Sequence, residues 1–144
     1  MILFKNYNKI VNSLLLLCIP IFFSCNNNKY VKPATSLDVG RDFIQASLHG
    51  DFKTAELLIL QDADNIQLFE AYKLYYKKLP AEKKESYQSA SYEINKYLDI
   101  NDSVTIINYS NDYMKKPMDI KLIKHNKEWW IDFKYTYSGN LPIN

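Results

Sequence analysis

The chain has 144 residues, of which 18 are basic and 16 acidic, so its formal net charge at pH 7 is +2. This length suits a single domain, and with Arg41 as its sole arginine the chain lacks the concentrated basic face of nucleic-acid-binding proteins. We therefore exclude nucleic acid as a partner. The two cysteines, Cys18 and Cys25, lie near the start of the chain, so we expect no disulfide within the folded domain.

Residues 10–25 form an apolar run that follows Lys5 and Lys9, and no acidic residue precedes position 38. A basic start, an apolar core and a small residue ahead of the cleavage point are typical of an export signal. A membrane-spanning helix needs roughly 20 apolar residues, whereas this run is shorter and is interrupted by Pro20. The pattern therefore favours an export signal over a retained membrane anchor.

The segment Phe22-Phe23-Ser24-Cys25 resembles the bacterial lipobox. In that family a diacylglyceryl group is attached to the cysteine thiol, and a dedicated peptidase cuts before it. The resemblance implies a lipoprotein signal peptide over residues 1–24 and lipidation of Cys25. Without Lys5 and Lys9 the mature chain keeps 16 of its 18 basic residues against 16 acidic ones and is formally neutral. An ordinary secreted protein with a free Cys25 thiol is the alternative.

Residues 25–34 are polar and aperiodic, and we expect them to form a lipid-anchored tether. Two or three acyl chains hold a protein at a membrane, because each buried CH₂ contributes about 0.8 kcal/mol. Many inner-membrane lipoproteins carry an aspartate where this chain has Asn26, and no acidic run follows. The resemblance therefore implies a location in the cell envelope, at the outer membrane and facing the periplasm.

Three helices are expected after this tether. The first begins near Ser36, a residue suited to an N-cap, and ends at Gly50. A short second helix follows, and the third is capped by Asp64 and runs to Pro80. Residues 81–86 are charged, and we expect a connector with at most one helical turn.

The rest of the chain has the character of β-structure. Four strands are expected, over residues 89–99, 103–109, 118–124 and 128–135. Period-two alternation in the last two indicates a sheet with one buried face, and it places Trp129 in the core and Trp130 on the opposite face. Helices followed by strands predict an α+β fold, with three N-terminal helices packed on a curved antiparallel sheet of about four strands.

Two motifs, Gly50-Asp51-Phe52 and Leu122-Ile123-Lys124 followed by Trp129, resemble those of the DUF4878-type exported lipoproteins. Those proteins are similar to the NTF2-like (cystatin-like) superfamily, in which helices wrap against a curved sheet to form a cone. The resemblance implies an NTF2-like domain over residues 35–137, with residues 138–144 as a C-terminal tail. It implies no activity, since the family itself is functionally undefined.

Three tyrosines are candidates for a binding pocket. Tyr72 and Tyr76 on the third helix and Tyr109 on a strand are placed to surround one cavity between helices and sheet. A cavity that is apolar with a few polar groups suits a small apolar ligand. The alternative, and the more ordinary role of tyrosine, is that the rings pack in the core.

Other residue types give little sign of chemistry. His49 and His125 are expected at a helix end and in a turn, where a solvated histidine is usual, so we assign no catalytic residue. No cysteine or histidine pair has ligand spacing, and the chain has no calcium or phosphate loop, so we expect no metal and no cofactor. Asp102-Ser103-Val104 resembles a three-residue O-glycosylation motif of exported bacterial proteins, which makes Ser103 a candidate glycosylation site.

Two functional hypotheses remain. The first is a non-enzymatic, lipid-anchored domain that binds a small apolar ligand or another envelope protein, with a homodimer through the Trp130 face left open. The second is a small cavity enzyme of the isomerase or dehydratase type. A buried carboxylate facing the helix–sheet pocket would favour the enzyme, and a filled or aromatic pocket would favour binding. We prefer the first, because no base is expected at a buried strand position.

Overall fold

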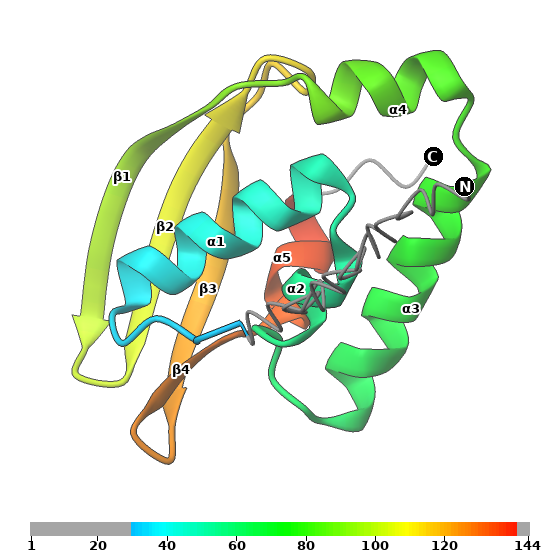
Figure 1. Ribbon diagram of the computed structural model, residues 1–144. Helices are drawn as coiled ribbons and strands as arrows, with labels where there is room; N and C mark the ends of the chain where they lie inside the picture. The colour runs from blue at the N-terminus through cyan, green and yellow to red at the C-terminus, as the bar shows by residue number, and fades with distance from the viewer. Residues whose placement is uncertain (1–29, 141–144) are drawn as a thin grey trace, which may run out of the picture.

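The computed structural model describes residues 30–140, so the expected signal peptide and Cys25 lie outside the described residues. Its elements, in chain order, are α1 (Ser36–His49), α2 (Phe52–Glu56), α3 (Ala63–Lys78), α4 (Ala81–Gln88), β1 (Tyr92–Asn101), β2 (Val104–Asn111), β3 (Met118–His125), β4 (Glu128–Ile131) and α5 (Phe133–Asn140). The strands form an open antiparallel sheet in the order β1-β2-β3-β4, and α1 lies across one of its faces (Figure 1). The expected α+β fold is confirmed.

One face of the sheet is buried by the helices. Ile107 of β2 pairs with Ile120 of β3, Leu122 of β3 pairs with Ile131 of β4, and all four side chains are 0 % exposed. The alternate residues, such as Ile106 beside Lys121, stay partly exposed on the other face. The period-two alternation thus marks the two faces of the sheet as expected.

The ends of α1 follow from local hydrogen bonding and backbone geometry. Thr35 is the N-cap, because its side chain accepts the Asp38 N–H at 3.2 Å, and it stands one residue before the expected cap. Ser36 is instead buried, and its hydroxyl bonds the Tyr97 hydroxyl of β1 at 2.8 Å. Gly50 ends the helix with a φ of 71°, a left-handed conformation that glycine adopts without strain.

The start of α3 differs from the expectation. Asp62, with the extended backbone of an N-cap, accepts the Asn65 N–H at 2.9 Å, whereas Asp64 lies within the first turn. The expected Asp64 cap is therefore wrong. Asn65 is fully buried, and its side chain donates to Asp62 and accepts the Lys134 N–H, each at 2.8 Å. This one amide joins the N-terminal ends of α3 and α5.

Two further elements are helical where other structure was expected. The connector over residues 81–86 is part of helix α4, which continues to Gln88. The fourth strand stops at Ile131 instead of residue 135. The backbone N–H and carbonyl of Ile131 both bond the segment after α2. Its N–H bonds the Leu58 carbonyl at 2.8 Å, and its carbonyl accepts the Leu60 N–H at 3.0 Å. Helix α5 then runs across the expected boundary between domain and tail at residue 137.

The two tryptophans of β4 differ less in burial than expected. Both are partly buried, so Trp129 lies at the edge of the core and not within it. Trp130 pairs with Ile123 on the opposite face, where the Lys32 ammonium lies over its ring. The expected assignment of the two faces is right, but the assignment of Trp129 to the centre of the core is wrong.

The described part of the expected tether is docked on the domain. The Tyr30 hydroxyl donates to Asp42 of α1 at 2.7 Å, and Lys32 forms an ion pair with Glu128 at 3.4 Å. Together with the Lys32–Trp130 contact, these bonds fix residues 30–34 against α1 and β4.

Candidate functional site

The structure brings two of the three candidate tyrosines to one small cavity. Tyr72 and Tyr109 line it together with Tyr87 of α4, whose hydroxyl lies 3.2 Å from that of Tyr72. Tyr76 does not line this cavity. Its ring packs edge-on against Tyr87, and its hydroxyl accepts a hydrogen bond from Gln88 at 3.0 Å.

This cavity is almost filled. Its volume is about 10 Å³, which is room for about one water molecule. The remaining lining consists of Phe43, Phe133 and the hydroxyls of Ser47 and Thr136, which have no hydrogen-bond partner among the described residues. Burial raises the pKa of Tyr72 and of Tyr109 well above the usual value, so both phenols stay protonated at neutral pH. The cavity therefore offers neither space for an apolar ligand nor a carboxylate or imidazole base.

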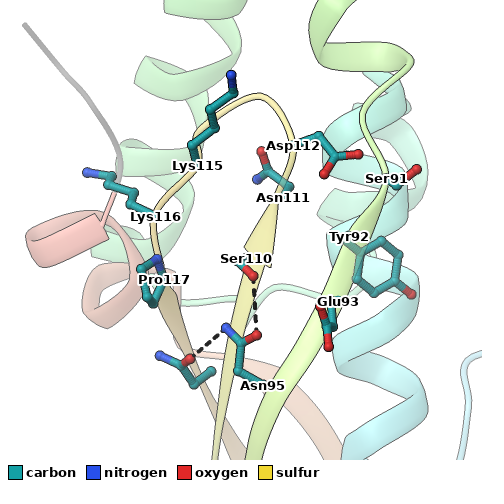
Figure 2. Close-up of a pocket in the computed structure, with 11 residues that line it drawn as sticks. Ser91, Tyr92, Glu93, Asn95, Ser110, Asn111, Asp112, Lys115, Lys116 and Pro117 are labelled. Atoms are coloured by element: carbon teal, nitrogen blue, oxygen red, sulfur yellow. Dashed lines mark hydrogen bonds between the residues drawn. The ribbon is translucent and has the colours of Figure 1, made fainter.

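A much larger open groove lies at the end of the sheet where β1 begins and where the loop joins β2 to β3 (Figure 2). Its volume is about 790 Å³, within the range of small-molecule sites. The side chains that line it are mostly polar and come from the start of β1, the end of β2 and the loop of residues 112–117. The expected candidates did not include this groove.

A chain of side-chain hydrogen bonds runs along the floor of the groove. Ser110 donates to the Asn95 amide oxygen at 3.2 Å, and the Asn95 amide nitrogen donates to Asn108 at 2.9 Å (Figure 2). Asn108 in turn donates to Asp119 of β3. Asn95 shares the outer face with Glu93, as alternation along β1 requires. It is the extra residue of a bulge, because the β1–β2 register shifts between Ile94 and Lys96.

The loop above this floor holds a buried donor and a strained backbone. The Asn111 side-chain oxygen accepts the Met114 N–H at 2.8 Å, which fixes the amide orientation. Its amide nitrogen is buried and has no hydrogen-bond partner among residues 30–140. Lys115 has a φ of 53°, which is an unfavourable backbone conformation for a residue with a β-carbon. Such strained conformations are often found at functional sites.

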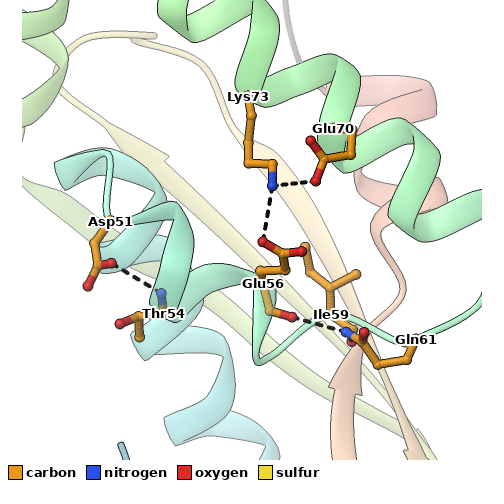
Figure 3. A network of polar contacts seen from close by, with 7 residues as sticks. All are labelled: Asp51, Thr54, Glu56, Ile59, Gln61, Glu70 and Lys73. Atoms are coloured by element: carbon orange, nitrogen blue, oxygen red, sulfur yellow. Dashed lines mark hydrogen bonds and ion pairs between the residues drawn. The ribbon is translucent and has the colours of Figure 1, made fainter.

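A second polar cluster lies between α2 and α3 and has a structural role. Lys73 of α3 bonds Glu56 of α2 at 3.0 Å and also pairs with Glu70 (Figure 3). Gln61 donates to the carbonyls of Glu56 and Ile59, at 3.1 and 2.7 Å. Burial alone would lower the pKa of Lys73, but its bonds to the two glutamates raise it. The cluster ties α2 and the segment after it to α3.

The remaining candidate residues lie at the surface. His49 and His125 are exposed, as expected, and Ser103 is exposed in the β1–β2 turn, where its N–H bonds the Asn101 side chain at 2.9 Å. Ser103 thus stays a predicted glycosylation site. In the part of the chain that the structure describes, no group of three His, Cys, Asp or Glu side chains is placed to hold a metal ion. Within residues 30–140, no helix has both the length and the apolar content to cross a membrane.

Comparison with family models, with curated proteins and with solved structures finds no match to this chain. The resemblance to DUF4878-type and NTF2-like proteins therefore stays a prediction.

Sequence reasoning missed the groove because its residues are far apart in the chain and each is individually ordinary. One signal was present: Asn108 and Ser110 occupy outward positions of β2, where Val104 and Ile106 are apolar. A change from apolar to polar residues along one strand face marks the end of the sheet at which the groove lies.

Proposed function

We propose that this chain is a non-enzymatic binding domain of the bacterial cell envelope, anchored to the membrane by lipid on Cys25, and that it recognises its ligand or partner at its surface. The observation that carries the binding role is the filled space between helices and sheet. Aromatic rings occupy it and leave about 10 Å³. A cavity enzyme of the isomerase or dehydratase type needs a substrate-sized space with a positioned base, and this interior supports neither requirement.

The membrane anchor is supported by the sequence alone. The segment Phe22-Phe23-Ser24-Cys25 follows an apolar run and a basic start. No second cysteine is present beyond Cys25, so a lipidated Cys25 leaves the domain without a free thiol. On this proposal the domain is displayed at the outer membrane, on the periplasmic side.

The anchor is tested by intact-mass analysis and detergent partitioning of the full chain, expressed in a bacterium with a lipoprotein pathway. We expect cleavage before Cys25 and a diacylglyceryl adduct in the wild type, and an uncut precursor for Cys25→Ala. Cys18→Ala is the matched control, because it makes the same change within the apolar run and should be processed normally. An unmodified N-terminus in the wild type would overturn the anchor.

The binding role is tested separately, by native mass spectrometry of the detergent-extracted protein. We expect a ligand or an envelope protein to co-purify with it. A protein that is extracted alone from its own cells, under conditions that preserve other envelope complexes, would contradict the binding role.

A further inference from the structure

One face of the sheet is left open by the helices of residues 30–140, which pack on the opposite face (Figure 1). An antiparallel sheet normally carries polar side chains on a face that meets water. This open face is instead apolar toward the β1–β2 and β3–β4 turns. The side chains of this part, which we call the apolar half of the open face, are Leu98, Ile100, Val104, Ile106, Ile123 and Trp130.

The apolar half is continuous across the four strands. Trp130 of β4 pairs with Ile123 of β3, and Ile123 pairs with Val104 of β2. In the next row, Leu98 of β1 pairs with Ile106 of β2. All five side chains are at least partly exposed, and Leu98 is 41 % exposed. A contiguous apolar patch of this kind marks a surface that contacts another protein or a membrane.

Lysines border the apolar half where the open face changes from apolar to polar. Lys121 of β3 pairs with Ile106 and forms an ion pair with Asp132 at 3.1 Å. Lys96 of β1, which is exposed, pairs with Asn108 in the row beyond. A lysine lays its methylene chain along apolar surface and keeps its ammonium in a polar layer. This border therefore suits the phosphate groups that lie above the acyl chains of a bilayer.

The chain that leads back to Cys25 meets the domain at this same end of the sheet. The Lys32 ammonium lies over the Trp130 ring, and the described chain begins at Tyr30, five residues after Cys25. An extended residue spans at most about 3.6 Å, so this short segment brings the apolar half close to a lipid on Cys25. The position of the anchor therefore favours a bilayer as the partner that covers the apolar half.

We propose that the apolar half of the open face lies on the surface of the bilayer. The inference rests on the lipid anchor proposed above and goes beyond it, because the domain itself then contacts lipid. Trp130 lies at the level of the headgroups, where tryptophan is enriched in membrane proteins. Leu98 and Ile100 reach the boundary with the acyl chains, and Lys96 and Lys121 bond lipid phosphates.

The first test uses the tryptophan fluorescence of the full, lipidated chain in vesicles of phosphatidylcholine and phosphatidylglycerol. Bromine atoms on the acyl chains quench a tryptophan only at short range. The chain has two tryptophans, on opposite faces of the sheet, so Trp129→Phe leaves only Trp130 and Trp130→Phe leaves only Trp129. We expect brominated vesicles to reduce the fluorescence of Trp130 and to leave that of Trp129 nearly unchanged.

A matched pair of double variants, made in the wild-type background with both tryptophans, tests the rest of the apolar half. Leu98→Gln with Ile100→Gln replaces side chains of β1 that are 41 % and 55 % exposed. Ile66→Gln with Leu74→Gln replaces side chains that are 38 % and 58 % exposed on α3, which lies on the helix-covered side (Figure 1). Because all four side chains are exposed, both variants should fold. We expect the β1 variant to lose the quenching by brominated vesicles and the α3 variant to keep it.

The outcomes distinguish the membrane contact from the anchor on which it rests. Equal quenching of both tryptophans, no quenching of Trp130, or equal loss in the two double variants would overturn the contact and leave the anchor in place. A dimer in native mass spectrometry that the β1 variant dissociates would assign the face to a second copy of this chain instead. A wild type whose intact mass shows no lipid adduct would overturn both the anchor and the contact, but not the binding role.

Discussion

At the scale of single residues, Asn65 shows how a polar side chain can determine an arrangement of helices. Its neighbourhood, Asp62-Ala63-Asp64-Asn65, reads in the sequence as a break between helices, and it gives no sign that the last residue is buried. The asparagine is fully buried because its amide is bonded on both sides, by Asp62 and by the Lys134 N–H. Such a bond depends on a backbone group 69 positions away, which sequence patterns do not reveal.

We expect Asn65→Ala to lower the free energy of unfolding by about 1–3 kcal/mol, because it leaves the Lys134 N–H buried without a partner. Gln67→Ala, at an exposed position of the same helix, is the control and should stay within about 0.5 kcal/mol of the wild type. Urea unfolding monitored by tryptophan fluorescence measures both. Equal stability of the two variants would show that the Asn65 bonds do not contribute to the fold.

At the scale of elements, the sequence predicted boundaries best where a helix cap or a tight turn alone determines them. Gly50 and the hairpin between β3 and β4 fall where the sequence placed them. The prediction of a strand after Ile131 was wrong, because the period-two pattern of Trp129, Ile131 and Phe133 continues into a helix. Phe133 is buried, as that pattern predicted, but α5 places it there, because β4 ends against the Leu58–Leu60 backbone.

The packing of α1 on the sheet depends on Gly40. A β-carbon at this position would collide with the Ile107 side chain and would lie 3.4 Å from Ile120 Cδ1. Gly40→Ala gains roughly 1 kcal/mol of helix propensity, but overpacking a core typically costs about 1–3 kcal/mol. We therefore expect a net loss of stability in thermal or urea unfolding.

Shortening the opposing side chain provides the control for this prediction. In an Ile107→Val background the colliding methyl group is absent, so Gly40→Ala should become neutral or stabilising. A double-mutant cycle measures the difference as a coupling energy between the two sites. Zero coupling would mean that α1 is held away from β2 by other contacts.

At the scale of the whole molecule, the α+β fold followed from the order of helical and alternating segments. The groove did not, because it needs a bulge at Asn95, the left-handed Lys115 and the β2–β3 loop in one place. The tyrosine cavity was anticipated as a cluster, but whether it would be open or filled depended on Phe133 of α5. That helix was not expected.

Substitutions of the two tryptophans of β4 should have different kinds of effect. Trp129→Ala removes a ring that packs against the core, so it should lower the global melting temperature. Trp130→Ala removes the ring beneath Lys32, so it should chiefly release residues 30–34 from the domain. Hydrogen exchange of the amides in this segment, measured for both variants, distinguishes the two effects. Faster exchange there in Trp129→Ala alone would contradict the assignment.

If Cys25 carries the proposed lipid, the docking of Tyr30 and Lys32 limits the distance between the domain and the membrane. Only residues 25–29 would lie between the lipid and the first docked side chain, and a fully extended chain of five residues reaches about 17 Å. Lys32 is held at the β3–β4 end of the sheet, through Glu128, whereas the groove lies at the opposite end (Figure 1). A protein lipidated at Cys25 would therefore stay within a short distance of its bilayer, and whatever it binds must itself come close to the membrane.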